Sequence, residues 1–230
     1  MTWSLPYLLL TLSAAQPIAG EPFSRDVRRN ASNATVQIAN TTQRCVGSGV
    51  IIRNDNGTVY ILTAGHVAQH GDTIEVRFFT PRSHPKPDSV HRSVTILASG
   101  KGSADLALLR LSTGKAVPTA LRLCSPEQAP REKSLPVLTV GCNGELAPSA
   151  VEGRTRKKTV RLSKEKDPVT LWEVEKDQQT GRSGGPMVDK RGLILGICSG
   201  KAEGRGYFCT AEQIQEFLKD HKVEWLAEDK

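Results

Sequence analysis

A serine flanked by glycines, in the motif GRSGGP at Gly181–Pro186, stands directly before a short apolar run. Two further motifs precede it along the chain. TAGHV at Thr63–Val67 ends one run of β-forming residues, and DLALLRL at Asp105–Leu111 opens another. Upstream of all three, GSGVII at Gly47–Ile52 combines glycines with residues that favour strands. Each motif alone is common in loops and turns, so the informative feature is that all of them occur together in this order.

Together the motifs supply a nucleophile, a base and a carboxylate. A serine hydroxyl is a poor nucleophile until a base accepts its proton. Histidine is the natural base, because its pKa lies near neutrality. A carboxylate on the far ring nitrogen fixes the tautomer and stabilises the imidazolium. The sequence therefore predicts that Ser183 attacks, His66 transfers the proton and Asp105 orients His66.

Short runs of β-forming residues, separated by turns, account for most of the chain. The turn NDNG at Asn54–Gly57 between two of them is a strong hairpin signal. Many short strands at this spacing indicate an all-β sandwich or barrel and argue against a parallel sheet with crossover helices. The predicted strands are Ala34–Ala39, Val46–Arg53, Val59–Thr63, Thr73–Phe79, Val94–Ala98, Leu106–Leu111, Ser134–Gly141, Thr159–Leu162, Val169–Val174, Pro186–Asp189, Leu193–Cys198 and Gly206–Cys209.

One helix is predicted, at the C-terminal end of the chain. Thr210 and Gln213 form a capping-box pattern. Ile214, Phe217 and Leu218 follow at i, i+3 and i+4 and define one apolar face, which should dock on the second set of strands. At the other end, Glu21–Ala31 is interpreted as a flexible lead-in.

These motifs resemble those of the chymotrypsin-like (trypsin-fold) serine proteases, over roughly residues 34–218. The most similar branch is the bacterial-type, high-temperature-requirement group, here without its PDZ domain. The resemblance implies two six-stranded antiparallel Greek-key β-barrels with the active site in the cleft between them, plus the C-terminal helix. A single domain would cover 21–230, with barrels at about 31–114 and 119–210 and the helix at 211–220.

The resemblance also implies an oxyanion hole and a substrate wall. The backbone N–H groups of Gly181 and Ser183 would point at one spot and bind the tetrahedral intermediate. Cys198-Ser199-Gly200 would pair with an extended peptide by β-augmentation. Asp177 lies where trypsin-like members carry the acid at the base of the specificity pocket. Its context, Lys176-Asp177-Gln178, is equally that of a solvated turn, which would favour cleavage after small or medium apolar residues instead of Arg or Lys.

The resemblance also bears on whether a protease of this kind needs cleavage of a zymogen to become active. Digestive relatives pair a new N-terminal ammonium with an acid just before the nucleophile, whereas Arg182 occupies that position here. A guanidinium cannot accept a hydrogen bond, so no zymogen switch of that kind is predicted. The Arg182 side chain itself is expected to face solvent.

The five cysteines allow two interpretations. Cys198 and Cys209 flank a predicted hairpin beside the specificity pocket, and facing positions on antiparallel strands can come within disulfide reach. The alternative is that both are packed free thiols, because sequence alone does not give connectivity. No C-x-x-C, H-E-x-x-H or paired histidine motif occurs, so neither a metal nor another cofactor is predicted.

Length and composition set the outer limits. The 230 residues, 38% hydrophobic, are enough for a packed core and too apolar for a disordered chain. The uncharged first 20 residues contain an apolar run at Leu5–Ala15 of signal-peptide length. We therefore expect a signal peptide at 1–20, a secreted or periplasmic protein, and no stable membrane insertion after its removal.

Three functions remain to be separated. The first is an active serine endopeptidase with polypeptide substrates. The second is a catalytically silent protease-fold module that binds peptides. The third, a nucleic-acid binder, rests only on the net charge of +7, and the basic run Gly153–Lys166 lacks the interleaved aromatics that single strands favour. No nucleic-acid partner is therefore predicted.

Overall fold

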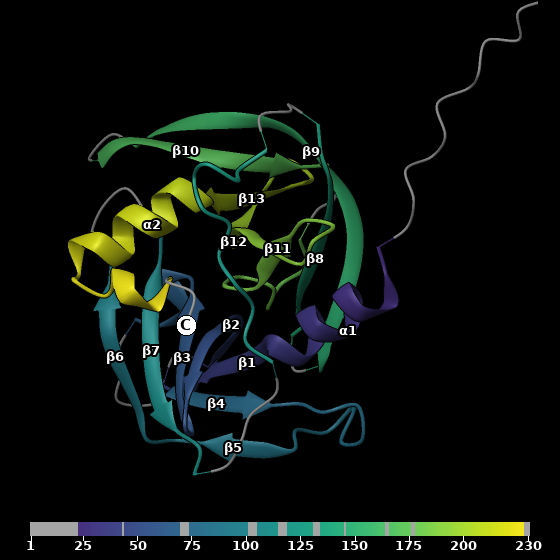
Figure 1. Ribbon diagram of the computed structural model, residues 1–230, viewed down its shortest axis with the longest axis vertical. Helices are drawn as coiled ribbons and strands as arrows, with labels where there is room; N and C mark the ends of the chain where they lie inside the picture. The colour runs from purple at the N-terminus through teal and green to yellow at the C-terminus, as the bar shows by residue number, and fades with distance from the viewer. Residues whose placement is uncertain are drawn as a thin grey trace, which may run out of the picture.

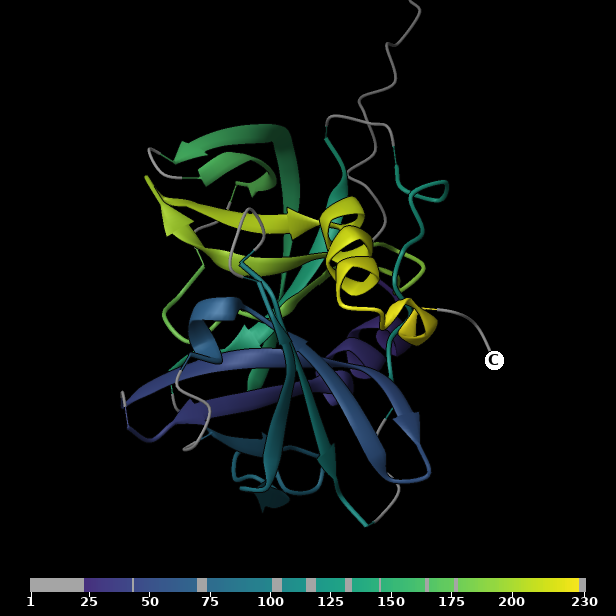
Figure 2. The same cartoon turned by 90° about the vertical axis from the view of Figure 1, so that its left-hand side faces the viewer.

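The structure is a computed structural model that describes residues 23–42, 44–69, 74–100, 105–114, 119–130, 134–144, 146–163, 166–175 and 178–227. Within these ranges the chain forms two curved β-sheets, one above the other, and the α-helices lie beside them (Figures 1 and 2). The predicted signal segment 1–20 lies outside the described residues. The fold is all-β with a C-terminal helix, as predicted.

The N-terminal sheet contains seven strands in the order β5-β4-β1-β2-β3-β7-β6, every neighbouring pair antiparallel. Its strands are β1 (Thr35–Asn40), β2 (Cys45–Asp55), β3 (Thr58–Thr63), β4 (Ile74–Phe78), β5 (Ser89–His91), β6 (Val94–Ser99) and β7 (Ala107–Ser112). The predicted count of six is therefore wrong for this sheet. The additional strand, β5, is only three residues long, and its SVH sequence carries no alternating pattern that could have revealed it.

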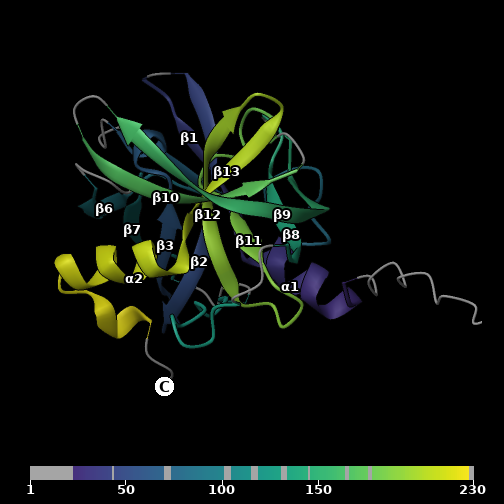
Figure 3. The same cartoon turned by 90° about the horizontal axis from the view of Figure 1, so that it is seen from above.

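The C-terminal sheet closes into a barrel in the order β10-β13-β12-β11-β8-β9, which confirms the predicted six strands (Figure 3). Its strands are β8 (Pro136–Cys142), β9 (Pro148–Ser163), β10 (Lys166–Val174), β11 (Pro186–Val188), β12 (Ile194–Ala202) and β13 (Arg205–Thr210). The long β9 begins well before the predicted strand Thr159–Leu162. The many basic residues of β9 obscured the full length of this strand in the sequence. One end of β9 pairs with β8 and the other end pairs with β10.

Three apolar clusters form the core of the two sheets. One fills the N-terminal sheet around Ile38, Ile51 and Ile61, and a second fills the barrel around Trp172 and Phe208. The third lies between the sheets and joins residues of both, including Leu62, Leu108, Leu138 and Ile197. The motifs singled out in the sequence are therefore carried by two separately packed units that share an apolar interface.

The helices pack at the edges of this interface. In α2 (Ala211–Asp220) the Thr210 side chain and the Gln213 side chain form the predicted capping box, and Ile214, Phe217 and Leu218 are buried as predicted. A short 3₁₀ turn, η3 (Glu224–Leu226), follows it. Within the described part of the chain, no helix combines the length and apolar character that a membrane crossing requires.

The predicted flexible lead-in is wrong, because α1 spans Arg25–Ala34. The Ser24 hydroxyl accepts a hydrogen bond from the Val27 N–H (3.2 Å) and caps its first turn. Phe23 is buried, and its N–H donates to the Glu152 carboxylate on β9. The sequence RDVRRNASNA has too few large apolar residues to signal a helix, since only Ala31 and Ala34 of α1 are fully buried.

Candidate active site

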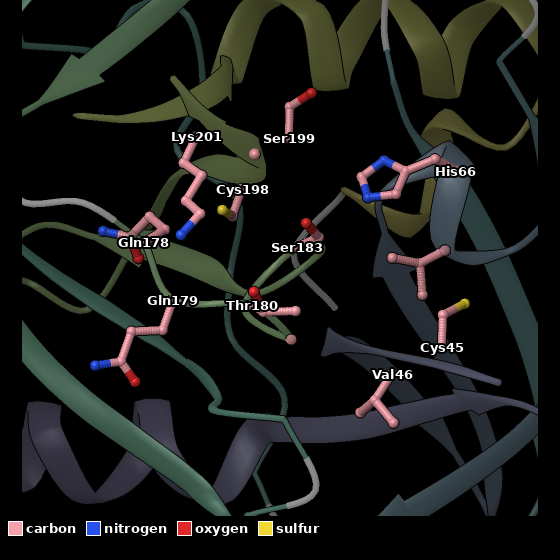
Figure 4. A pocket seen from close by; sticks show the side chains of 13 residues that line it. Cys45, Val46, His66, Gln178, Gln179, Thr180, Ser183, Cys198, Ser199 and Lys201 are labelled. Carbon is pink, nitrogen blue, oxygen red and sulfur yellow. The ribbon is translucent and has the colours of Figure 1, made fainter. Parts of the chain in front are cut away.

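The candidate site is a pocket of about 330 Å³ between the two sheets. The N-terminal sheet and the turn that follows β3 contribute Cys45, Val46, His66 and Val67. The C-terminal half contributes residues 178–181, Ser183 and residues 198–201. The structure thus brings together His66 and Ser183, which are far apart in the sequence, and Figure 4 shows both side chains facing the same space.

Strand register places His66 beside Asp105. β3 and β7 pair in antiparallel register with Thr63 opposite Ala107, so the end of one strand meets the start of the other. His66 follows β3 on the single 3₁₀ turn η1 (Gly65–Val67), and Asp105 precedes β7. The Asp105 carboxylate accepts two hydrogen bonds from His66: Oδ1 from the backbone N–H (2.9 Å) and Oδ2 from ring Nδ1 (2.7 Å). The carboxylate is therefore bound to His66 at two points, one on the backbone and one on the ring.

A third group completes this arrangement. The Ser199 hydroxyl, on β12, donates to Asp105 Oδ2 at 2.8 Å. Sequence reasoning assigned Ser199 to the substrate wall, and its contact with Asp105 was missed. No local motif marks such a contact, because it joins strands from two different sheets.

The electrostatics of the pair follow from these contacts. The hydrogen bond to Asp105 raises the pKa of His66 above its usual 6.5, and this effect outweighs the opposing effect of burial. For Asp105, burial alone would raise the pKa. The contacts with His66 and Ser199 outweigh it, so the pKa of Asp105 lies below its ordinary value. At neutral pH Asp105 is therefore a carboxylate.

Ser183 is held by the backbone of both sheets. Its C=O accepts from the Ser48 N–H (2.7 Å) on β2, and the next residue, Gly184, donates its N–H to the Cys198 C=O (2.7 Å) on β12. The Ser183 hydroxyl faces the His66 ring across the pocket (Figure 4). These two described side chains do not hydrogen-bond in this structure, and such contacts often tighten only when substrate is bound.

Two hydrogen bonds fix the loop before Ser183, and in both a carbonyl group of the loop accepts from a residue that does not line the pocket. The Thr180 C=O accepts from the Gly144 N–H (2.8 Å), and the Gly181 C=O accepts from the Ser48 hydroxyl (2.7 Å). Gly181 has φ +96°, and a Cβ there would lie 2.5 Å from the Gly144 nitrogen, so only glycine fits. The N–H groups of Gly181 and Ser183 donate to no residue in the described part of the chain.

The predicted substrate-wall residues all line the pocket. Cys198, Ser199 and Gly200 form one side, and Lys201 extends into the pocket beside them (Figure 4). Lys201 was not singled out from the sequence. Asp177, the predicted pocket-base acid, lies outside the described residues.

The predicted Cys198–Cys209 disulfide is wrong. In the β12–β13 register Cys209 lies opposite Ile197, while Cys198 lies opposite Phe208. Because successive side chains on a strand alternate between faces, the two thiols point to opposite sides of the sheet. Cys198 belongs to the barrel cluster and Cys209 to the cluster between the sheets. None of the five cysteines, all of which lie within the described ranges, forms a disulfide.

Arg182 also departs from expectation. Its side chain was predicted to face solvent. The residue is only 3% exposed, and the guanidinium lies inside the C-terminal barrel. Among the described residues, no group of three or more His, Cys, Asp or Glu side chains could hold a metal ion.

Comparisons with known proteins agree with this geometry. Residues 47–197 match the family described as "Trypsin-like peptidase domain". The chain is 23% identical over 187 residues to the Serine protease Do-like HtrA of Bacillus subtilis, covering 78% of this chain and 40% of that protein. It is 22% identical over 190 residues to the Serine protease HtrA-like of Staphylococcus aureus, covering 76% and 23%. The chain therefore spans less than half the length of these relatives.

Solved structures show the same fold. The active form of the Rv3671c protease from M. tuberculosis aligns with a TM-score of 0.67 at 22% identity, covering 93% of each chain. The HtrA-type protease AlgW with tripeptide aligns with a TM-score of 0.67 at 21% identity, covering 87% of this chain and 63% of AlgW. Because the family model matches residues 47–197, the chain belongs to the trypsin-like peptidase domain family.

Proposed function

We propose that this protein is a serine endopeptidase that uses His66, Asp105 and Ser183 as a catalytic triad. The observation that carries the proposal is the two-point contact between His66 and Asp105 at the pocket that Ser183 also lines. Because Nδ1 is bound to the carboxylate, Nε2 is the ring nitrogen left to accept the Ser183 proton. This division of roles is the one that a serine nucleophile requires.

The reaction follows from these positions. Ser183 Oγ attacks the scissile carbonyl carbon as its proton moves to His66, and the carbonyl oxygen becomes an oxyanion. The N–H groups of Gly181 and Ser183 donate to that oxyanion. His66 then protonates the leaving amine, which departs and leaves an acyl-enzyme. Water deprotonated by His66 attacks the ester and releases Ser183.

The substrate is an extended polypeptide. The backbone at Cys198-Ser199-Gly200 borders the pocket and would pair with the residues before the scissile bond. One structural neighbour, AlgW, was solved with a tripeptide, which supports peptide binding at this fold. An exported location remains part of the proposal, resting on the apolar segment at 1–20 and on similarity to HtrA-type proteases.

The test is covalent labelling. A fluorophosphonate probe should label the wild-type protein stoichiometrically and should not label Ser183→Ala, because only an activated serine reacts. Casein or a peptide library should be cleaved by the wild type, and the cleavage should stop with the same substitution. A folded wild-type protein that binds peptides but takes up no probe would instead be the silent binding module, and the endopeptidase proposal would be wrong.

A further inference from the structure

The C-terminal barrel contains a buried cation that the triad does not use. The Arg182 guanidinium donates to five groups on β8 and β9: the carbonyl and hydroxyl of Thr139, the carbonyl of Gly141, and the carbonyl and hydroxyl of Ser149. Two further acceptors come from loops, namely Asn143 Oδ1 (3.2 Å) and Gln178 Oε1 (3.0 Å). Every one of these acceptors is neutral, and no described carboxylate is among them.

Such an arrangement is not explained by stability. Removing a cation from water without a counter-charge costs free energy, and hydrogen bonds to neutral acceptors only partly offset it. Burial accordingly lowers the pKa of Arg182, although a guanidinium remains charged at any physiological pH. A purely apolar interior, without the arginine and its side-chain acceptors, would avoid this cost.

The loop acceptors of Arg182 lie next to the proposed oxyanion hole. Arg182 lies between Gly181 and Ser183, two pocket-lining residues whose N–H groups donate to no residue in the described part of the chain. Gln178 begins the loop that leads to them, and Asn143 adjoins Gly144, whose N–H holds the Thr180 carbonyl. One side chain therefore ties together the two loops that set the orientation of the Gly181 peptide.

The barrel is shaped around this side chain. A Cβ on Gly141 would lie 3.1 Å from Arg182 Cα and Cβ and 3.2 Å from Cγ, so the glycine lets β8 approach the arginine stem closely. The five N–H donors of a guanidinium project in a fixed planar fork. Arg182 can thus hold its backbone in one orientation in a way that a flexible cation could not.

We propose that Arg182 is a positioning residue that holds the oxyanion hole in its working geometry, with neutral groups of the barrel taking the place of an ionic partner. The inference rests on the proposed endopeptidase activity. It also implies that the hole is formed in the chain as folded, without a new N-terminal ammonium. Loss of Arg182 should impair the transition state much more than substrate binding, because the hole acts only on the oxyanion.

The experiment compares Arg182→Met, Arg182→Lys and the matched control Arg156→Met with the wild type. Arg156 is an exposed arginine on β9, so its loss removes the same charge from the same barrel. Active sites are titrated with fluorophosphonate, and kcat is expressed per titrated site. We expect kcat to fall about 100-fold in Arg182→Met and about 10-fold in Arg182→Lys, with KM within about threefold of the wild type. Arg156→Met should leave both unchanged.

A tetrahedral inhibitor separates positioning from folding. A peptide boronic acid places an oxygen of its Ser183 adduct in the hole, so its inhibition constant should rise in parallel with the loss of kcat. Thermal unfolding of Arg182→Met should stay within about 5 °C of the wild type. Should that variant fail to fold, Asn143→Ala removes one loop acceptor, and we expect it to lower kcat about threefold or more at unchanged KM.

Two results would overturn the inference. The first is a folded Arg182→Met or Asn143→Ala protein with wild-type kcat per titrated site. The second is a loss of titratable sites in proportion to lost stability, with normal kcat in the remainder. Failure of the proposed function looks different, because the wild type itself would then lack turnover that depends on Ser183.

Discussion

The two sides of the pocket hold charge in opposite ways. On the ion-pair side, defined by His66, Asp105 and Ser199, a carboxylate faces a base, and both side chains keep contact with water, 31% and 44% exposed for Asp105 and His66. On the arginine side, defined by Arg182 and its neutral acceptors, a permanent cation is almost fully buried with no anion against it among the residues that the structure describes. His66, which must change protonation in the proposed mechanism, keeps a charged partner and contact with solvent. Arg182, which is proposed only to hold the backbone in place, is enclosed by neutral hydrogen-bond acceptors.

The difference separates chemistry from geometry within one site. The ion-pair side adjusts the pKa of a proton acceptor, so its variants should change the dependence of activity on pH. The arginine side adjusts no proton transfer, so its variants should change kcat without moving that dependence. Each prediction below tests one half of this contrast.

The largest effect within the ion-pair side is expected for Asp105→Asn. The asparagine keeps the size of the side chain and removes the charge, so His66 loses the partner that fixes its tautomer. Loss of about 10⁴-fold in kcat at neutral pH is expected, as for the equivalent change in the well-studied serine protease triad. Steady-state kinetics on a protein of unchanged circular dichroism and thermal midpoint would measure it. A loss below about tenfold would remove Asp105 from the triad.

The pH profile provides the second test. His66 must be neutral to act as a base, and its hydrogen bond to Asp105 raises its pKa above 6.5. The logarithm of kcat/KM should therefore rise with pH and level off only above that value. Lowering the pH from about 8 to about 5.5 should cost at least about 10-fold. In Arg182→Lys the whole curve should move down without moving sideways, and a sideways shift there would break the proposed separation.

Much of the ion-pair side could be read from the sequence, and the reason is local. His66, Asp105 and Ser183 lie at the ends of strands next to glycines, so short motifs identify them, and the β3–β7 register then brings two of them together. Ser199 was predicted only as part of the substrate wall, and its hydrogen bond to Asp105 was missed because it crosses from one sheet to the other. The two-sheet fold followed from the same motifs by resemblance.

The arginine side could not be read in this way. An arginine in a glycine-rich loop is normally solvated, and the cage around Arg182 is contributed by residues 139–149 and 178, which carry no signal when taken separately. The Cys198–Cys209 prediction failed because a hairpin fixes which strands pair but not the register. A shift of one residue moves a side chain to the opposite face. Helix α1 was missed because its buried residues are mostly alanines.

A smaller effect should follow from Ser199→Ala. The hydroxyl donates one of the hydrogen bonds that keep Asp105 charged, yet both contacts from His66 remain. We expect kcat/KM to fall about threefold to tenfold, the range for one ordinary hydrogen bond, because the Asp105 side chain is partly solvated. The alkaline shift of the His66 limb should persist, because its main cause is the direct hydrogen bond to Asp105. A loss as large as that of Asp105→Asn would show that Ser199 acts on substrate as well.

The smallest expected effect concerns the thiols, whose reactivity reports how exposed the ion-pair side and the arginine side of the pocket are. Cys45 lines the pocket near His66 and is partly exposed, whereas Cys124, Cys142, Cys198 and Cys209 are buried. Burial raises the pKa of Cys142 and of Cys198, which lie near Arg182, to about 12, so neither forms a thiolate at neutral pH. A disulfide reagent such as dithionitrobenzoate should therefore modify one thiol in the native protein and all five after denaturation. Cys45→Ser should abolish the native reaction while changing kcat/KM less than about threefold, since no catalytic step uses Cys45. A second thiol reacting at a comparable rate without denaturant would show that the barrel interior around Arg182 opens readily, and the contrast between a solvated and an enclosed side would then be wrong.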